Sequence, residues 1–149
     1  MALRLPDDFK DFLKLCTQKR VKYLLIGGYA VHYHGYPRST GDMDIWIELS
    51  PSNAAKVVKA FHAFGYRAPD MHEELFLEKG AIVRMGNPPL RLEIVNEISG
   101  VTFARCYAAR KRAIIDGIRV NLINLQHLKK NKKAAGRPKD LNDLEHLPD

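Results

Sequence analysis

Two aspartates, Asp42 and Asp44, stand two residues apart in an apolar run that ends at Ile47. Side chains two residues apart on a β-strand point to the same face, roughly 6–7 Å from each other along the strand. Two carboxylates held this closely on a half-buried strand repel each other unless a cation neutralises them. Hard divalent cations such as Mg²⁺ take carboxylate oxygens as ligands. The pair therefore predicts a metal site with Asp42 and Asp44 as ligands.

The segment upstream of the aspartates has the features of a phosphate-binding turn. Residues 23–26 are a short apolar run typical of a buried strand, and the glycine pair after it allows a sharp turn and a close approach of the backbone to a ligand. A helix over residues 30–34 would begin there with free N–H groups, which favour phosphate. An arginine between this helix and the aspartates can clamp a phosphate through its fork of donors. The predicted nucleotide-binding residues of this segment are Gly27, Gly28, Arg38 and Thr40.

The stretch from the glycine pair to the aspartates, GGYAVHYHGYPRSTGDMDIWI, resembles the signature of the nucleotidyltransferase superfamily that includes DNA polymerase beta and the aminoglycoside nucleotidyltransferases. Its full spelling is more similar to the small bacterial nucleotidyltransferase-like proteins of toxin–antitoxin and abortive-infection systems. The resemblance implies transfer of a nucleoside monophosphate from an NTP to a hydroxyl acceptor, with two Mg²⁺ ions (or Mn²⁺) and release of pyrophosphate. This chain departs from the superfamily at Gly28, where a serine often places its hydroxyl on a terminal phosphate.

A third carboxylate is expected on a later strand. The superfamily carries it in the spelling R-h-D-h-h, where h is hydrophobic, and residues 91–95, Arg-Leu-Glu-Ile-Val, match with glutamate in place of the commoner aspartate. The resemblance thus assigns Glu93 to the metal site and to activation of the attacking hydroxyl. The alternative is that Glu93 is an ordinary solvent-facing strand residue. Glu97 is a weaker substitute, since Asn96 and Ser99 indicate that the strand has ended.

The C-terminal segment, HLKKNKKAAGRPKDLNDLEHL, also resembles the small nucleotidyltransferase-like proteins, in which a lysine, a Gly-Arg pair and a following Lys-Asp recur. On this basis Lys132 and Arg137 are expected near the triphosphate, where they would counter charge on the leaving pyrophosphate. Lys139 and Asp140 are expected to pair locally and cap the last helix. The structural alternative is a basic helix hairpin packed on the core by its leucines. These are Leu125, Leu128, Leu141 and Leu144.

The apolar pattern predicts an α/β (α+β) fold with a small mixed sheet, helices packed against it and basic C-terminal helices. This arrangement resembles the nucleotidyltransferase fold. A hairpin is expected from strands over residues 74–78 and 81–85 around Lys79-Gly80, with a second turn at Asn87-Pro88-Pro89. The other expected helices are 6–20, 51–64, 102–110 and 124–147 with a break at 136–138, and the other expected strands are 43–47, 90–95 and a pair within 113–123 around Asp116-Gly117.

The length of 149 residues predicts one domain, with residues 1–100 as the catalytic core and 101–149 as its basic C-terminal helical portion. The net charge of +7 is concentrated there, because residues 101–149 hold 11 Lys+Arg against 5 Asp+Glu. Such a field can steer nucleotide and an RNA acceptor. Two cysteines fit a reducing cytoplasm, and no apolar stretch is long enough to predict a membrane span.

Two other classes of function stay open. The first is a catalytically degenerate binding protein of the same fold, acting as one half of a toxin–antitoxin pair. The second is an RNA-binding module that works through the basic C-terminal third. For the enzyme, the acceptor is open between a tRNA end or another RNA, a protein and a small molecule. A homodimer or a partner chain is expected to complete the acceptor site, because a domain of this size leaves little room for one.

Overall fold

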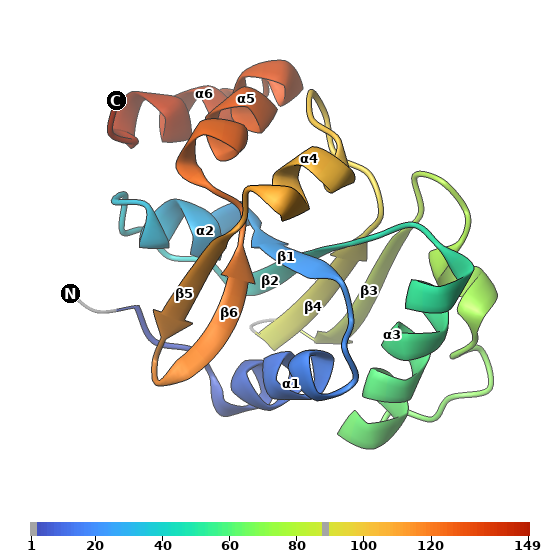
Figure 1. The fold of residues 1–149 in the computed structure, drawn as a ribbon. Coiled ribbons are helices and arrows are strands. Elements are labelled where there is room, and N and C mark those ends of the chain that lie inside the picture. The colour runs from blue at the N-terminus through green and yellow to red at the C-terminus, as the bar shows by residue number, and fades with distance from the viewer. Residues whose placement is uncertain (1–2, 88–89) are drawn as a thin grey trace.

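The computed structural model describes residues 3–87 and 90–149. In this part of the chain, a six-stranded mixed sheet has the strand order β3-β4-β2-β1-β6-β5 (Figure 1). The strands are β1 (Tyr23–Ile26), β2 (Asp42–Ile47), β3 (Ile82–Asn87), β4 (Leu90–Val95), β5 (Lys111–Ile115) and β6 (Ile118–Leu122). The helices are α1 (Asp7–Gln18), α2 (Gly27–Tyr33), α3 (Pro51–Phe64), α4 (Phe103–Ala108), α5 (Leu125–Ala135) and α6 (Pro138–His146), with a 3-10 turn η1 (Glu73–Phe76). The expected fold class is therefore confirmed.

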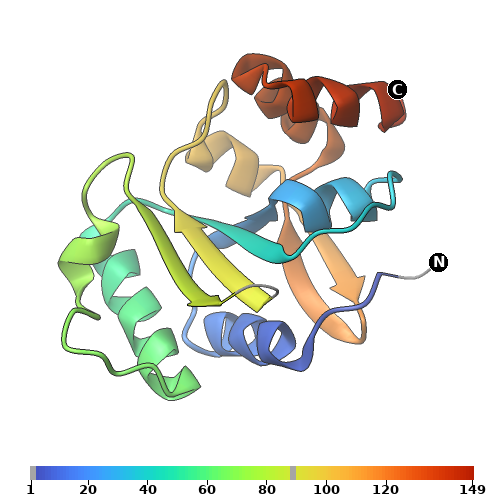
Figure 2. The same cartoon turned by 180° about the vertical axis from the view of Figure 1, so that it is seen from behind.

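Helices cover both faces of the sheet. In Figures 1 and 2, α1 and α3 lie on one side, and α2, α4, α5 and α6 lie on the other. The α1–α3 layer is held by aromatic packing, including Phe12 against Phe61 with ring centroids 4.6 Å apart. Strand β2 alternates between the faces, so Met43 and Ile45 are buried in the core while the two aspartates lie on the opposite face, where the Asp44 carboxylate is next to Gly27 at the start of α2.

The ends of α3 are fixed by local sequence. Ser50 is the N-cap and its hydroxyl accepts a hydrogen bond from the Asn53 N–H at 3.2 Å. Pro51 occupies the first turn, where its missing N–H costs nothing. Gly65 ends the helix in the left-handed conformation, with φ of +102°. The predicted helix over residues 51–64 is confirmed at both boundaries.

The junction of β1 and α2 is tighter than the sequence indicates. The helix begins at Gly27, directly after the strand, and not at residue 30. Gly27 has φ of +67°, a conformation that side chains with a Cβ rarely adopt. A Cβ at this position would also collide with the Asp44 carboxylate. The glycine thus allows the strand to enter the helix with no loop and brings the start of α2 against β2.

The hairpin predicted around Lys79-Gly80 is wrong. Residues 73–76 form the turn η1, because Phe76 is buried and stacks against Phe61 in the core, with ring centroids 6.0 Å apart. Strand β3 instead pairs antiparallel with β4, with Ile82 opposite Val95 and Asn87 opposite Leu90. The turn predicted at Asn87-Pro88-Pro89 falls on Pro88 and Pro89, which lie outside the described residues.

The strand pair around Asp116-Gly117 is confirmed as β5 and β6, and β6 runs parallel to β1. The helical segment that follows breaks after Ala135, as predicted. Of its leucines, Leu128 is buried, but Leu141 is 49% exposed and does not pack on the core. Among the described residues, no helix combines the length and apolar character needed to cross a membrane.

Candidate functional site

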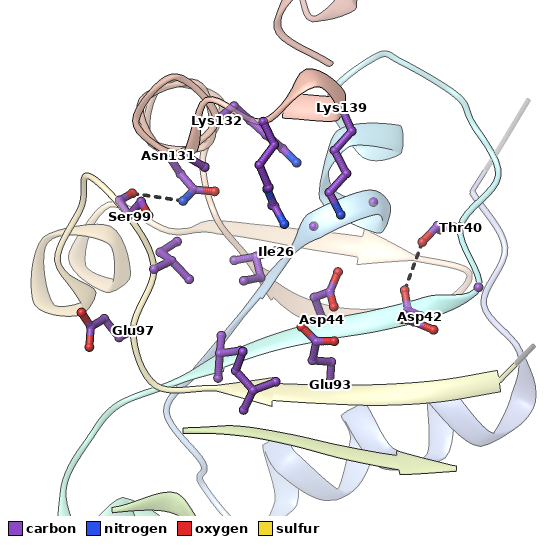
Figure 3. A pocket seen from close by; sticks show the side chains of 18 of the residues that line it. Ile26, Thr40, Asp42, Asp44, Glu93, Glu97, Ser99, Asn131, Lys132 and Lys139 are labelled. Atoms are coloured by element: carbon purple, nitrogen blue, oxygen red, sulfur yellow. Dashed lines mark hydrogen bonds between the residues drawn. The ribbon is translucent and has the colours of Figure 1, made fainter. Parts of the chain in front are cut away.

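One pocket of about 700 Å³ contains every site residue named from the sequence (Figure 3). It lies between the start of α2, the loop that follows α2, strands β2 and β4, and helices α5 and α6. The nine residues are Gly27, Gly28, Arg38, Thr40, Asp42, Asp44, Glu93, Lys132 and Arg137. They come from segments up to 110 positions apart in the chain, and the fold brings all of them to one hollow.

The carboxylates meet through strand register. Strands β2 and β4 are parallel neighbours, with Asp44 opposite Glu93 and Asp42 opposite Arg91. Because residues opposite each other point to the same face, Asp44 and Glu93 lie side by side in the pocket (Figure 3). The predicted placement of Glu93, on the face away from the buried Leu92 and Ile94, is confirmed.

Asp44 is the electrostatically strained member of this set. Burial first of all, and then the charges of Glu93 and Asp42, raise its pKa to about 6. Lys139 and Lys132 act in the opposite direction and hold part of this rise back. Within the described residues, Asp44 makes no ion pair, so its negative charge is the one that a bound cation would relieve most.

The other two carboxylates are paired with arginines on the same face. Arg91 donates from Nη2 to Asp42 Oδ2 at 2.9 Å, and Arg84 donates from Nε to Glu93 Oε2 at 3.0 Å. No group of three His, Cys, Asp or Glu side chains converges closely enough to hold a metal ion among the residues described. The donor chemistry nevertheless suits a hard cation, because an unpaired and desolvated carboxylate stands beside two more. A metal would compete with the arginines for Asp42 and Glu93.

The glycine pair and Thr40 pack against each other. A Cβ at Gly28 would lie 2.5 Å from Thr40 Oγ1 and 2.7 Å from Thr40 Cβ, so the threonine fills the space that any side chain at position 28 would need. The Thr40 hydroxyl donates to the Asp42 carbonyl at 3.1 Å. Thr40 therefore presents a hydroxyl beside the backbone of Gly28, in the pocket wall next to Asp42.

A network of five charged side chains closes the opposite wall of the pocket. Asp143 accepts two hydrogen bonds from Arg38, at 2.9 and 3.0 Å, and forms an ion pair with Lys132 Nζ at 3.1 Å. Asp140 accepts from the same Lys132 at 3.2 Å and from Arg137 Nε at 2.7 Å. The side chains of Lys132, Asp140 and Asp143 are 6% exposed or less. The network joins the loop after α2 to α5 and α6.

The network has consequences for the residues predicted to bind phosphate. Three cations and two anions leave one net positive charge at the pocket wall. Burial alone would raise the pKa of Asp140, but the hydrogen bonds from Arg137 and Lys132 outweigh it and lower that pKa. Arg38 and Arg137 line the pocket with their guanidinium groups already oriented by aspartates, so each is held in place as well as charged.

Several pocket residues were missed by the sequence analysis. The expected pair of Lys139 with Asp140 is wrong, since Asp140 pairs with Lys132 and Arg137, and Lys139 extends from α6 into the pocket (Figure 3). The expected helix cap is confirmed for Asp140, which accepts a hydrogen bond from the Arg137 N–H at 3.2 Å. Asn131 also lines the pocket and donates to the Ser99 carbonyl at 3.0 Å. Asp143 stands three residues after Asp140, so helical spacing alone indicated that both lie on one face of α6.

Comparisons with known proteins agree with the fold. No protein-family model matches this chain, and no curated protein matches it in sequence. Among solved structures, the chain is similar to the crystal structure of a putative nucleotidyltransferase from Thermotoga maritima, with a TM-score of 0.62. The match covers 92% of this chain and 88% of that one, at 13% sequence identity. The two proteins therefore share the nucleotidyltransferase-like fold.

Proposed function

We propose that the protein is a metal-dependent nucleotidyltransferase that moves a nucleoside monophosphate from an NTP to a hydroxyl acceptor and releases pyrophosphate. One observation carries this proposal: the nine residues named from the sequence line a single pocket of about 700 Å³. The shared fold with a protein described as a putative nucleotidyltransferase supports the same class of reaction. The acceptor is proposed to be a hydroxyl of RNA, protein or a small molecule.

In this proposal, the carboxylates of Asp42, Asp44 and Glu93 would hold Mg²⁺ or Mn²⁺. When bound, such ions supply Lewis-acid stabilisation of charge on the reacting phosphate and favour a deprotonated hydroxyl. In this proposal the chain itself also contributes a proton acceptor, because Glu93 lines the pocket beside Asp44 and can take the proton of an attacking hydroxyl.

The remaining pocket residues would bind the triphosphate. Gly27 and Gly28 line the pocket at the start of α2, where backbone N–H groups would donate to phosphate oxygens. Lys132, Arg137 and Lys139 line the side of the pocket formed by α5 and α6. Their positive charges would stabilise the charge that develops on the leaving pyrophosphate.

The first test is ligand-induced stabilisation. We expect one or more NTPs with Mg²⁺ to raise the midpoint of thermal unfolding, because a ligand that binds only the folded state stabilises it by about 2.7 kcal/mol at a hundredfold excess over its Kd. The shift should vanish in the double variant Asp42→Asn/Asp44→Asn. The matched control is Asp7→Asn/Asp11→Asn, which removes two carboxylates from the exposed surface of α1 and should keep the shift.

The second test is turnover. The protein is incubated with each NTP labelled at the α-phosphate and with RNA, protein or small hydroxyl compounds, and pyrophosphate is measured together with the labelled product. Transfer that needs Mg²⁺ and is lost in Asp42→Asn/Asp44→Asn is the expected result. Transfer that is unchanged in this double variant would contradict the proposed roles of both aspartates.

A second candidate function is nucleotide binding without transfer, in a degenerate member of the same fold that acts with a toxin–antitoxin partner. The observation that favours it is the pairing of Asp42 with Arg91 and of Glu93 with Arg84, which supplies both carboxylates with internal counter-charges. This candidate predicts NTP-induced stabilisation that needs no divalent cation and produces no pyrophosphate. The two measurements above separate it from the enzyme.

A further inference from the structure

The pocket that contains Asp42, Asp44 and Glu93 is called the carboxylate pocket below. A second groove of about 640 Å³ lies outside it and shares none of its lining residues. It is bordered by the segment between α1 and β1, by α3 and α4, and by the β5–β6 hairpin. Five basic side chains line it, and its described lining contains no acidic residue. We call it the basic groove; its cations are Arg20, Lys22, Lys56, Arg112 and Arg119.

The fold gathers these cations from different elements. Arg20 and Lys22 lie between α1 and β1, Lys56 lies on α3, and the other two lie on β5 and β6. In the β5–β6 hairpin, Arg112 is opposite Asn121 and Arg119 is opposite Ile114, so both arginines point to the same exposed face. Basic residues along one helix often form only a solvated face. The cations of this groove come instead from several elements that the tertiary structure brings together.

Most of this charge has no internal partner. Lys22 is 3.6 Å from Glu48, and no ion pair within 4.0 Å is formed by the other four cations in the described part of the chain. Like charges that converge in one hollow repel each other and lower the stability of the folded state. A bound polyanion would remove this repulsion, and the cations would raise its local concentration.

The backbone at Arg20 adds an independent sign of function. Arg20 has φ of +60° in the turn after α1, a position where helices commonly end with glycine. A residue with a side chain in this conformation costs about 1–3 kcal/mol relative to glycine, and such strain is concentrated at functional sites. The chain therefore keeps an arginine charge at the groove where glycine would be the more stable choice.

We propose that the basic groove binds the phosphate backbone of a nucleic acid. Three of its five cations are arginines, whose planar forks match phosphate oxygens in a bidentate way. Five charges exceed what a single phosphate requires, which indicates an extended polyanion. Tyr107 at the groove is already stacked on Phe103 and covered by Arg110, 4.0 Å above its ring, so it offers no free face for a base. Binding is therefore directed at the backbone and is independent of sequence. It does not rest on the proposed nucleotidyl transfer.

The test measures binding of a fluorescent 20-nucleotide single-stranded RNA of mixed sequence, and of the DNA strand with the same sequence, without NTP or divalent cation. Fluorescence anisotropy is recorded over a series of salt concentrations. The test variant is Arg112→Ala/Arg119→Ala, two exposed positions whose change leaves the core intact. The control variant is Lys130→Ala/Lys133→Ala on α5, which removes the same charge from exposed positions outside both pockets.

Both strands should bind to the wild-type protein, since the contacts are to phosphates. For single strands, each lost phosphate contact reduces the slope of log K against log salt by about 0.7, so the groove variant should lose about 1.4 in slope and at least about tenfold in affinity at low salt. The lysine control should stay within about twofold of wild type. Arg112→Lys/Arg119→Lys, which keeps the charge, should restore the salt dependence but bind more weakly than wild type, because lysine cannot form the bidentate contact.

Three results would overturn the proposal. The first is equal loss in the groove variant and in the lysine control, because net charge alone would then explain binding. The second is undiminished binding in the groove variant. The third is that polyglutamate of equal charge displaces the labelled RNA at the same concentration at which unlabelled RNA displaces it. The groove would then be a site for acidic peptides. Circular dichroism of each variant confirms that the fold is retained before binding is compared.

Discussion

At the scale of single residues, the pocket contains an electrostatic cost that the fold does not relieve. Asp44 lies beside Glu93 and near Asp42, and burial and these charges raise its pKa to about 6. A carboxyl group whose pKa is higher in the folded state stabilises the fold when it is protonated. This stability is fully present below the unfolded pKa of about 3.8 and is lost as the pH rises through about 6. At neutral pH and without a bound cation, the ionised Asp44 therefore lowers the free energy of unfolding.

We predict that Asp44→Asn stabilises the metal-free protein at pH 7.5. The difference between pKa values of 3.8 and about 6 corresponds to up to about 3 kcal/mol, since each unit is worth about 1.4 kcal/mol. The gain should shrink to zero below pH 4, where Asp44 is protonated in wild type. Urea unfolding in EDTA at both pH values measures it. Asp42→Asn is the control, because it breaks the pair with Arg91 and should give no such gain. A variant less stable than wild type at both pH values would contradict the prediction.

Gly28 and Thr40 are predicted to be coupled by sterics. Gly28→Ala should cost about 1–3 kcal/mol of unfolding free energy, because its Cβ would overlap the threonine side chain 2.5 Å away. Adding Thr40→Gly removes the obstacle, so the double variant should be more stable than the sum of the single effects by about 1 kcal/mol or more. Chemical denaturation of the four proteins gives this coupling energy.

Gly65 provides the matched comparison for this cycle. A Cβ at Gly65 meets no atom within 4 Å, although its positive φ makes alanine strained there as well. Gly65→Ala combined with Thr40→Gly should therefore be additive. If the effects of Gly28→Ala and Thr40→Gly were additive, the Thr40 side chain would be free to move away from a Cβ at position 28. Thr40 would then not be the reason why this position is glycine.

Sequence was a good guide to residue types at the site and a poor one to their partners. The alternation in residues 91–95 placed Glu93 on the exposed face, because local period follows from strand geometry. The same alternation puts Arg91 on that face, yet its pairing with Asp42 depends on the parallel register of β2 and β4. Register between strands separated by some fifty residues is set by tertiary packing, which local pattern does not encode.

At the scale of elements, α5 and α6 are attached to the face of the sheet that carries the aspartates by charge as well as by packing. Asp143 on α6 joins Arg38, in the loop after α2, to Lys132 on α5. The residues of this cluster are separated by up to 105 positions. Because the cluster is nearly buried, each aspartate is satisfied by neighbours and not by water. Removing one member therefore weakens the pairing of the buried charges that remain.

Asp143→Ala is predicted to be one of the most destabilising single changes outside the apolar core. Breaking one partner of a buried ion pair costs about 3–5 kcal/mol, and here Arg38 loses its ion-pair partner while Lys132 keeps only Asp140. Urea unfolding measures the loss. Glu145→Ala, an exposed carboxylate on the same helix, should stay within about 0.5 kcal/mol of wild type. Equal effects of the two changes would mean that the network adds nothing beyond helix α6 itself.

Elements with strong local signals were predictable, and those decided by distant packing were not. Helix α3 carries its own start and stop signals in Ser50, Pro51 and Gly65, so its bounds followed from the sequence. The segment at 73–78 lacks such signals. Its Phe76 is buried against Phe61 of α3. This contact between residues fifteen positions apart favours a 3-10 turn at residues 73–76 in place of the predicted strand. The local apolar pattern is the same for both.

At the scale of the whole molecule, the charge is divided between two separate hollows. The carboxylate pocket combines acidic strands with a basic wall, and the basic groove contains only cations among its charged described residues. Helix α4 lies over the sheet beside both, with Phe103 against Trp46 and Tyr107 at the groove. The proposed nucleotide donor and the proposed nucleic acid would therefore contact different side chains of the same molecule.

Hydrogen exchange should separate the two sites in the intact chain. Mg²⁺ with the preferred NTP is expected to slow exchange in residues 27–44 and 131–140, because these segments line the carboxylate pocket. Single-stranded RNA is expected to slow exchange in residues 17–22 and 111–121, which line the basic groove. Asp42→Asn/Asp44→Asn should abolish the first pattern alone, and Arg112→Ala/Arg119→Ala the second alone. If both ligands protected the same segments, the two hollows would be parts of one binding surface, and the division of charge would reflect a single extended substrate that crosses α4.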